Sequence, residues 1–441
     1  MKRRIFLGAS AGTALAGMQG CRVKKIETAA KVPPAVEKGV IAGKTLAELR
    51  ERYRYDLFDD FLPFLDRYVI DHEYGGFMCT TDRSGKNITT DKSAWFEGRG
   101  IWVYSFLYNR ISHDPKHLEV ARKSVEFILK HKPAGDEFWT GSFSKEGKPK
   151  SGPGDIYGGL FIAEGFSEYS RAAGDDSYWN LAKDILIRHL RRYDSPEYEY
   201  AVTYGPDIPT FKAPRVLGHW MVLIRLVTQM LENKSDPELE TIANRCIEAI
   251  TKRHFNPAFG LMNEAINHDF LRPTDGFEQF SYTGHAIETL WMVLFEAARR
   301  KDRALYRQAA EMFKRHVEIA WDDVYGGEFR CLVHVDNNIW KVDKVLWLQE
   351  EVLIGTLFMI ENTGDRWAQE WFAKMYTYVM DKFPLKQYGY PLWIVSADRK
   401  VTFEEKASRV ENFHHPRHLM INLLALDRII QRGNRVSDLL A

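Results

Sequence analysis

From Leu46 almost to the C-terminus, apolar residues recur at three- and four-residue spacing. This spacing is typical of amphipathic helices that bury one side, and their number predicts an all-α fold. The predicted helices lie near residues 45–69, from 95 onward, and near 115–132, 155–173, 176–193, 214–232, 236–253, 282–300, 302–320, 344–362, 366–383 and 415–431. A segment rich in Gly, Ser and Lys, 136–154, is predicted to be a hairpin or loop.

Every second predicted helix carries an unusual polar or aromatic residue near its start. These residues are Arg99, Tyr157, His219, His285, Trp347 and His414. Their spacing of roughly 60 residues accommodates two helices and their loops. Six such pairs predict an (α/α)6 barrel, a toroid of six inner and six outer helices, with all inner helices starting on one rim. An open solenoid would use the same packing without closing the ring.

Two histidines are the strongest candidates for chemistry. His285 and Glu288 are three residues apart, so they share one helical face. A carboxylate beside an imidazole orients it and raises its basicity, which prepares a general base near neutral pH. His414, just ahead of Pro416, stands at the start of the last helix and would face His285 across one pocket. A hydrogen-bonded core pair is the alternative explanation for His285 and Glu288.

Arg99 lies in a stripe with Trp95 and Trp102, at four- and three-residue spacing. The guanidinium could stabilise negative charge that develops on a substrate oxygen. Alternatively, it could stack on tryptophan where two helices pack.

Trp347 and Glu351 also share one helical face. Trp347 could be a stacking platform for a sugar and Glu351 a polar clamp for its hydroxyl groups. Alternatively, Trp347 is a core residue. His219 and Tyr157 are further candidates for substrate binding. A histidine on an apolar helix is, however, more often a core residue.

Composition narrows the function classes. The net charge is +1 and basic residues are dispersed among acidic ones, which gives no nucleic-acid footprint. The four cysteines form no metal-binding spacing. The sequence contains no phosphate-binding loop, no dinucleotide fingerprint and no zinc-protease motif. We therefore predict neither phosphoryl nor hydride transfer, and no metal.

The N-terminus is predicted to be a leader. Residues Lys2–Leu7 resemble a twin-arginine export signal and precede an apolar stretch too short to span a membrane. Cys21 is a candidate site for lipid attachment. We expect residues 1–21 to be a signal peptide, 22–42 a linker and 43–435 the catalytic domain. The expected location is the periplasm or, with the lipid, a membrane surface.

Four segments together resemble the N-acylglucosamine 2-epimerase superfamily, which includes cellobiose 2-epimerases and mannose isomerases. They are Trp95–Trp102, Gly284–Glu288, Lys344–Glu351 and Phe413–Arg417. The resemblance covers Leu46 to Arg432, and it implies an (α/α)6 barrel whose chemistry requires no metal or redox cofactor. One departure is Leu346, at a position where the family often has a second tryptophan.

The resemblance also implies roles for the candidate residues. His285 and His414 match the family's general acid/base pair, which removes the C2 proton of an open-chain sugar and returns it to the opposite face. Arg99 would stabilise the enediolate, and Glu288 would orient His285. The residues expected to bind the sugar or assist ring opening are Trp102, Tyr157, His219, Trp347 and Glu351.

The expected partner is therefore a small sugar, and a homodimer would be ordinary. An aldose–ketose isomerase or a cellobiose-type epimerase is the nearest alternative. An (α/α)6 glycoside hydrolase would need two opposed carboxylates, for which Asp155, Glu288 and Glu351 are candidates. A non-catalytic sugar-binding protein is a third alternative, although it would not need two bases.

Overall fold

A computed structural model describes residue 36 and residues 39–82, 84–135, 137–204, 208, 210–274, 276–384, 396–397, 399–400 and 412–440. All of them belong to one compact unit, Pro33–Ala441. The predicted signal peptide and most of the predicted linker lie outside the described residues. Within these described ranges, no helix has the length and apolar character needed to cross a membrane.

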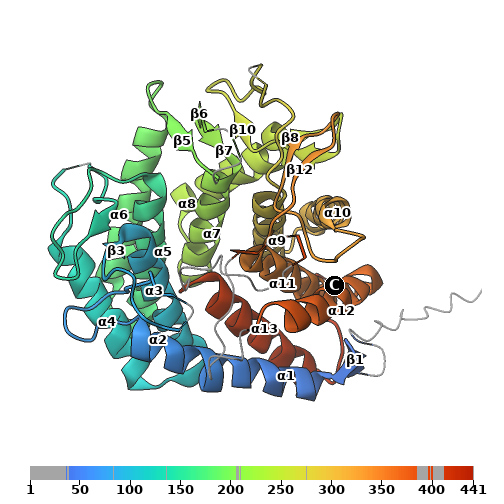
Figure 1. The fold of residues 1–441 in the computed structure, drawn as a ribbon, viewed down its shortest axis with the longest axis horizontal. Helices are drawn as coiled ribbons and strands as arrows, with labels where there is room; N and C mark the ends of the chain where they lie inside the picture. Colours follow the sequence, from blue (N-terminus) through green and yellow to red (C-terminus); the bar gives the residue numbers. More distant parts are fainter. Residues whose placement is uncertain are drawn as a thin grey trace, which may run out of the picture. The chain divides into compact units, whose positions relative to one another are not determined.

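Six helices of the described chain form an inner ring and are buried along most of their length. They are α3 (Ala94–Leu107), α5 (Ile156–Ala173), α7 (Leu217–Asn233), α9 (Thr283–Arg300), α11 (Leu346–Thr363) and α13 (His414–Gln431). Each packs against the next, and α13 packs against α3 (Figure 1). At this junction the Asn412 amide donates to the Phe96 carbonyl at 3.1 Å. The ring is therefore closed, which confirms the barrel and excludes the solenoid.

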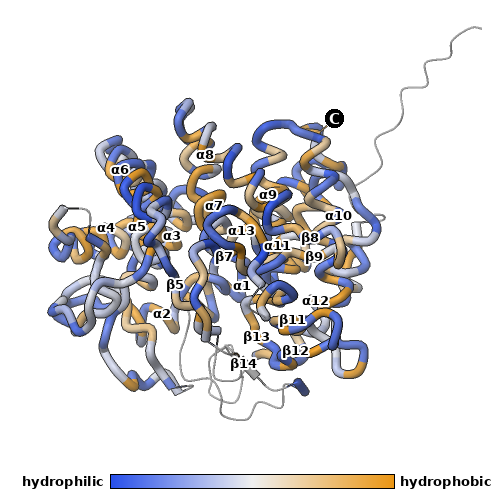
Figure 2. The backbone as a smooth tube through the Cα atoms, turned by 90° about the horizontal axis from the view of Figure 1, so that it is seen from above, coloured by the Kyte–Doolittle hydropathy of each residue, from blue (hydrophilic) through white to orange (hydrophobic). Residues whose placement is uncertain are grey.

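An outer layer of helices covers the ring, and each outer helix buries only one side. Hydrophobic and hydrophilic residues alternate along these helices in Figure 2. The outer helices are α4 (Pro115–Lys130), α6 (Asp176–Tyr193), α8 (Pro237–Glu248), α10 (Arg303–Ala320) and α12 (Arg366–Lys382). The sixth outer position is taken by α1 (Leu46–Tyr55) and α2 (Leu62–Tyr68), joined by a π-helical segment, Asp56–Phe61. Because α1 packs against α13, the first and last of the described helices form the sixth pair of outer and inner helices.

Helix capping differs between the two layers. The outer helices α4, α6, α8, α10 and α12 all start after an aspartate whose side chain accepts a backbone N–H of the first turn. Such a cap contributes about 1 kcal/mol. The inner helices α7, α9, α11 and α13 start without a side-chain cap. The residue at which an outer helix begins is thus determined by its own capping aspartate. Most inner helices begin where the connectors around the rim place them.

Short antiparallel strand pairs form these connectors. In the described chain the pairs are β1 (Val40–Ile41) with β2 (Lys44–Thr45), β3 (Lys92–Ser93) with β4 (Ser142–Phe143), β5 (Tyr200–Val202) with β6 (Phe211–Ala213), β7 (Arg215–Val216) with β10 (Ala265–Ile266), β8 (Phe255–Asn256) with β9 (Leu261–Met262), β11 (Cys331–His334) with β12 (Ile339–Lys341), and β13 (Lys344–Val345) with β14 (Ser396–Ala397). Strands β3, β7 and β13 lead directly into α3, α7 and α11.

Two of these connectors contain the same turn, which we call the Lys–Asp turns: Asp71–Phe77 with Lys92, and Asp322–Glu328 with Lys344. In each turn a fully buried lysine binds the aspartate, at 2.8 Å for Lys92 and 3.0 Å for Lys344. Each lysine also donates to a glycine carbonyl of the turn. Both turns place two successive glycines in the left-handed region, which favours glycine. The turns therefore fix the connectors that enter α3 and α11.

Candidate active site

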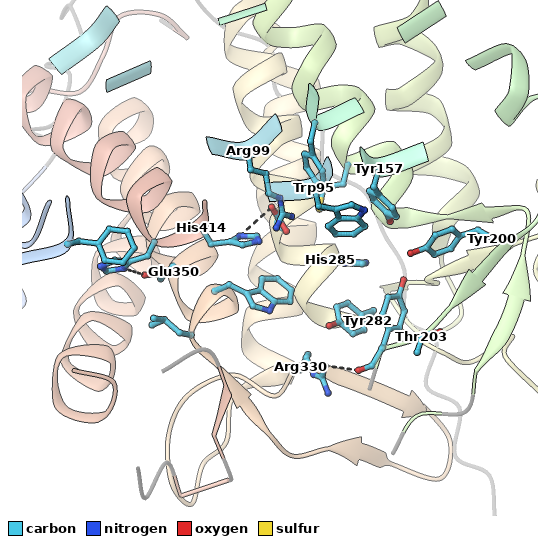
Figure 3. A pocket seen from close by; sticks show the side chains of 18 residues that line it. Trp95, Arg99, Tyr157, Tyr200, Thr203, Tyr282, His285, Arg330, Glu350 and His414 are labelled. Carbon is cyan, nitrogen blue, oxygen red and sulfur yellow. Dashed lines mark hydrogen bonds and ion pairs between the residues drawn. The ribbon is translucent and has the colours of Figure 1, made fainter. Parts of the chain in front are cut away.

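A cavity of about 290 Å³ opens among the starts of the inner helices (Figure 3). Its walls combine side chains of the inner helices with side chains of the connectors. The lining residues are Phe61, Trp95, Arg99, Tyr157, Phe161, Tyr200, Thr203, Tyr204, Met221, Tyr282, His285, Glu288, Arg330, Leu346, Trp347, Glu350, His414 and His415. Most of the rim residues predicted from the repeat thus meet at one place.

His285, near the start of α9, is held by Glu264. Its Nδ1 lies 2.9 Å from the Glu264 carboxylate, which also accepts the Tyr204 hydroxyl. Because a carboxylate only accepts, Nδ1 carries the proton, and Nε2 is left as the basic atom. We expected Glu288 to orient His285. This expectation is wrong, because the carboxylate that contacts His285 belongs to Glu264, in the connector between β9 and β10.

His414, at the start of α13, belongs to a second carboxylate cluster. Its Nδ1 lies 2.9 Å from Glu351 and 4.0 Å from Glu288. Arg417 donates to Glu288 at 2.6 Å and to Glu351 at 2.5 Å, with all three side chains buried. Glu351 also accepts the Trp291 indole N–H at 2.6 Å. Glu351 is therefore not the predicted clamp for substrate hydroxyls, because it lies beneath His414 and does not line the cavity.

Trp347 lies between the two histidines. Its ring centroid is 6.2 Å from that of His285 and 5.3 Å from that of His414. A Cβ at Gly284 would lie 2.5 Å from the indole, so this glycine makes room for it. Leu346 lines the cavity beside the indole. The cavity floor between the histidines is thus one aromatic ring with an aliphatic neighbour.

Arg99 reaches the cavity from α3, as predicted. Its guanidinium carbon lies 4.2 Å from the ring centroid of Phe161 and 4.8 Å from that of Phe413. These rings hold a permanent positive charge at the cavity wall, above His414 and His285 in the view of Figure 3. Trp102 does not line the cavity. It is fully buried, and its indole donates to Gln229 at 2.6 Å, so the predicted contact with substrate is corrected to a core contact.

Tyr157 lines the cavity, whereas His219 does not. The imidazole of His219 is fully buried, with ring centroids 4.7 Å from Tyr157 and 4.8 Å from Tyr200. Burial lowers the pKa of His219 far below its ordinary value. His219 thus packs against Tyr157 and does not reach the cavity, where it was predicted to bind the sugar.

Gly218, the residue before His219, lies close to two cavity residues. A Cβ at this position would be 2.2 Å from the Tyr157 hydroxyl and 3.0 Å from His285.

Several lining residues come from connectors and were not predicted. They are Tyr200, Thr203, Tyr204, Tyr282 and Arg330, together with Glu264 behind His285. Arg330 forms an ion pair with Asp343 at 2.8 Å and donates to the Tyr204 carbonyl at 2.8 Å. The tyrosine-rich stretch 193–212 was the available signal, but no sequence spacing relates it to α9.

The sequence model of the N-acylglucosamine 2-epimerase (GlcNAc 2-epimerase) family matches residues 75–418 of this chain. The chain belongs to this family. It is 25% identical to the N-acylglucosamine 2-epimerase of Bos taurus over 407 residues, covering 88% of this chain and 94% of the relative. It is 22% identical to the cellobiose 2-epimerase of Bacteroides fragilis over 399 residues, covering 85% of this chain and 98% of the relative.

Solved structures show the same fold. The cellobiose 2-epimerase from Spirochaeta thermophila superposes with a TM-score of 0.74 at 18% identity, over 87% of this chain and 98% of that protein. A D-mannose isomerase superposes with a TM-score of 0.68 at 13% identity, over 88% of this chain and 97% of that protein. The predicted resemblance and the predicted barrel are thereby confirmed.

Proposed function

We propose that this protein is a sugar 2-epimerase in which His285 and His414 exchange the C2 proton of an open-chain sugar. The observation that carries the proposal is the pair of histidines in one cavity, each held at Nδ1 by a buried carboxylate at 2.9 Å. Nε2 of each ring is the nitrogen that we propose exchanges the proton. Arg417 also lies 3.0 Å from Nδ1 of His414. The names of the relatives, N-acylglucosamine and cellobiose 2-epimerases, support the same reaction class.

The reaction needs little more than these groups. The C1 carbonyl acidifies the C2 proton, which one neutral imidazole removes while Arg99 stabilises the enediolate oxygen. The other histidine, as imidazolium, then returns a proton from the opposite face, and the configuration at C2 inverts. Trp347 between the two rings supports the sugar from below.

Within this class we propose an N-acylglucosamine/N-acylmannosamine type of substrate. A volume of about 290 Å³ is just below the ~300–1,000 Å³ typical of small-molecule pockets, which favours a monosaccharide over a disaccharide. Leu346 in place of a second aromatic platform favours it too. An aldose–ketose isomerase shares the enediolate and differs only in returning the proton to C1.

The decisive experiment is proton NMR in D2O with a panel of reducing sugars, including N-acetylglucosamine, N-acetylmannosamine, glucose, mannose and cellobiose. We expect the C2 proton signal of one sugar to disappear as the epimer accumulates, and His285→Ala and His414→Ala each to abolish this exchange. His72→Ala, at an exposed histidine away from the cavity, is the matched control.

Formation of a ketose would identify the isomerase alternative. Release of sugar from an oligosaccharide, with no C2 exchange in any reducing sugar, would instead support a glycoside hydrolase. The structure offers that alternative little support. The carboxylates of Glu288 and Glu351 bind Arg417, and Asp155 accepts the Trp95 indole N–H at 3.0 Å.

We also propose export, on the strength of Lys2–Leu7 and the apolar stretch that follows. Fractionation of cells that express the full chain, compared with an Arg3→Lys/Arg4→Lys variant, tests this location. Lipid attachment at Cys21 and a homodimer stay predictions from the sequence.

A further inference from the structure

A second histidine–carboxylate cluster lies beside the proposed catalytic histidines and has no role in the proposed proton exchange. It consists of Glu350 on α11 and His415 and His418 on α13, all more than nine-tenths buried. His415 and His418 are three residues apart and therefore share one face of α13. Glu350 and His415 also line the cavity (Figure 3).

The donor atoms of this cluster converge. One ring nitrogen of His415, one ring nitrogen of His418 and a carboxylate oxygen of Glu350 lie within 4.8 Å of one another. His418 Nδ1 is 3.5 Å from Glu350 Oε1. Ligand atoms of a tetrahedral ion with bonds of 2.0–2.1 Å are about 3.4 Å apart, which the distance between His418 and Glu350 matches. His415 Nδ1 already forms a hydrogen bond with Glu350 Oε1, so these two atoms would have to move apart to admit an ion.

His418 points its Nδ1 into the cluster without a conventional hydrogen bond to any residue that the structure describes. Its other nitrogen, Nε2, lies 3.0 Å from the Tyr53 hydroxyl, which in turn accepts the Asn422 amide at 3.1 Å. Metal-binding histidines are typically oriented through their second nitrogen in this way. The ring of His418 is therefore already positioned as a ligand.

A neighbouring cluster on α9, α11 and α13 provides a contrast. Glu288, Glu351 and His414 also bring three donor atoms together. There, Arg417 binds both carboxylates at 2.6 and 2.5 Å, so a guanidinium already occupies the position that a cation would take. Donor geometry therefore points to the first cluster as the place for an ion.

We propose that Glu350, His415 and His418 bind one divalent transition-metal ion, of which Zn²⁺ is the best match. Two imidazoles and one carboxylate suit Zn²⁺, and a fourth position on the cavity side would hold water or a substrate hydroxyl. The ion would be additional to the two-histidine chemistry, and this inference stands without the proposed function.

The test uses the full chain, stripped with a chelator and then titrated with zinc chloride by calorimetry. After desalting, elemental analysis should find one zinc per wild-type chain. His418→Gln and Glu350→Gln should each weaken zinc affinity at least tenfold, whereas His414→Gln in the Arg417 cluster should bind zinc as the wild type does. Thermal melts confirm that each variant is folded.

X-ray absorption of the zinc-loaded wild type is a second measurement that needs no variant. It should show two imidazoles with oxygen ligands. The proposal is wrong if the wild type retains no zinc, or if His418→Gln retains it with unchanged affinity. A coordination shell without imidazole would also exclude it, as would zinc that is lost only in His414→Gln.

Discussion

Glu97 offers a sharp test of the Lys–Asp turns, because Gln349 occupies its equivalent position in the second turn. The Glu97 carboxylate accepts the Phe77 backbone N–H at 2.9 Å. Gln349 likewise accepts the Glu328 N–H at 2.8 Å, and its amide also donates to the Glu328 carbonyl at 3.1 Å. A glutamine at position 97 should therefore fit the first turn and make both contacts.

The expected gain follows from the pKa of Glu97, which burial raises from 4.5 to about 8. Because the folded state holds the proton more tightly than the unfolded state, stability from this group is highest below pH 4.5 and falls as pH rises to 8. At 1.36 kcal/mol per pKa unit, the loss is about 1 kcal/mol at pH 5 and about 3 kcal/mol at pH 7. Glu97→Gln removes this loss.

For a chain of this length, 1 kcal/mol corresponds to roughly 1 °C in Tm. We thus expect differential scanning calorimetry to show Glu97→Gln melting about 1 °C above wild type at pH 5 and about 3–4 °C above it at pH 7. The reverse change, Gln349→Glu, should lower Tm, and more so at pH 7. An equal gain at both pH values, or a loss, would refute the argument from the buried proton.

The other predictions concern the first turn and the site. Lys92→Met should destabilise the protein by about 3–5 kcal/mol in urea unfolding, because it leaves a buried carboxylate unpaired. Glu264→Gln should lower kcat about 10²–10⁴-fold with little change in KM, because an amide can present its NH2 group to Nδ1 and no longer fixes the tautomer of His285. Gly218→Ala should lower kcat/KM about 10²-fold by displacing Tyr157 and His285, with C2 exchange as the assay.

Two control variants and three contradicting outcomes test these predictions. Lys344→Met should lower the free energy of unfolding less than Lys92→Met does, because Arg399 also binds Asp322, at 2.8 and 3.0 Å. Equal losses would show that Arg399 does not compensate for the missing lysine, and no loss in Lys92→Met would show that the buried pair does not stabilise the protein. Trp102→Phe should leave KM for the sugar unchanged, as befits a core residue. If Glu264→Gln kept the wild-type rate, Glu264 would have no part in positioning the base.

The barrel could be predicted from the sequence because helical period and hairpin repeat are both local patterns. How far each residue of an inner helix lies below the rim of the barrel could not be predicted. Trp102 shares a face with Arg99 but lies about 4.5 Å further along the axis, given the helical rise of 1.5 Å per residue. Glu351 lies about 6 Å beyond Trp347 for the same reason. Inner helices are buried on all sides, so apolar pattern alone does not mark the cavity.

The residue behind His285 was missed for a different reason. Glu288 is near it in sequence, and three-residue spacing made it the natural candidate. Glu264 is 21 residues away, in a connector whose path depends on the pairing of β10 with β7. The Tyr204 hydroxyl, which shares the same carboxylate, comes from another connector. Contacts of this kind arise from tertiary packing, and no local pattern encodes them.

The contact between α1 and α13 determines when a complete site can form during synthesis of the chain. Tyr53 of α1 meets His418 of α13 across 365 residues, and this closure is entropically the most demanding in the ring. His414 lies on that last helix, so a chain still being synthesised holds Arg99 and His285 without the second base of the proposed mechanism. Under the proposed mechanism, catalysis therefore begins only once α1 and α13 have met.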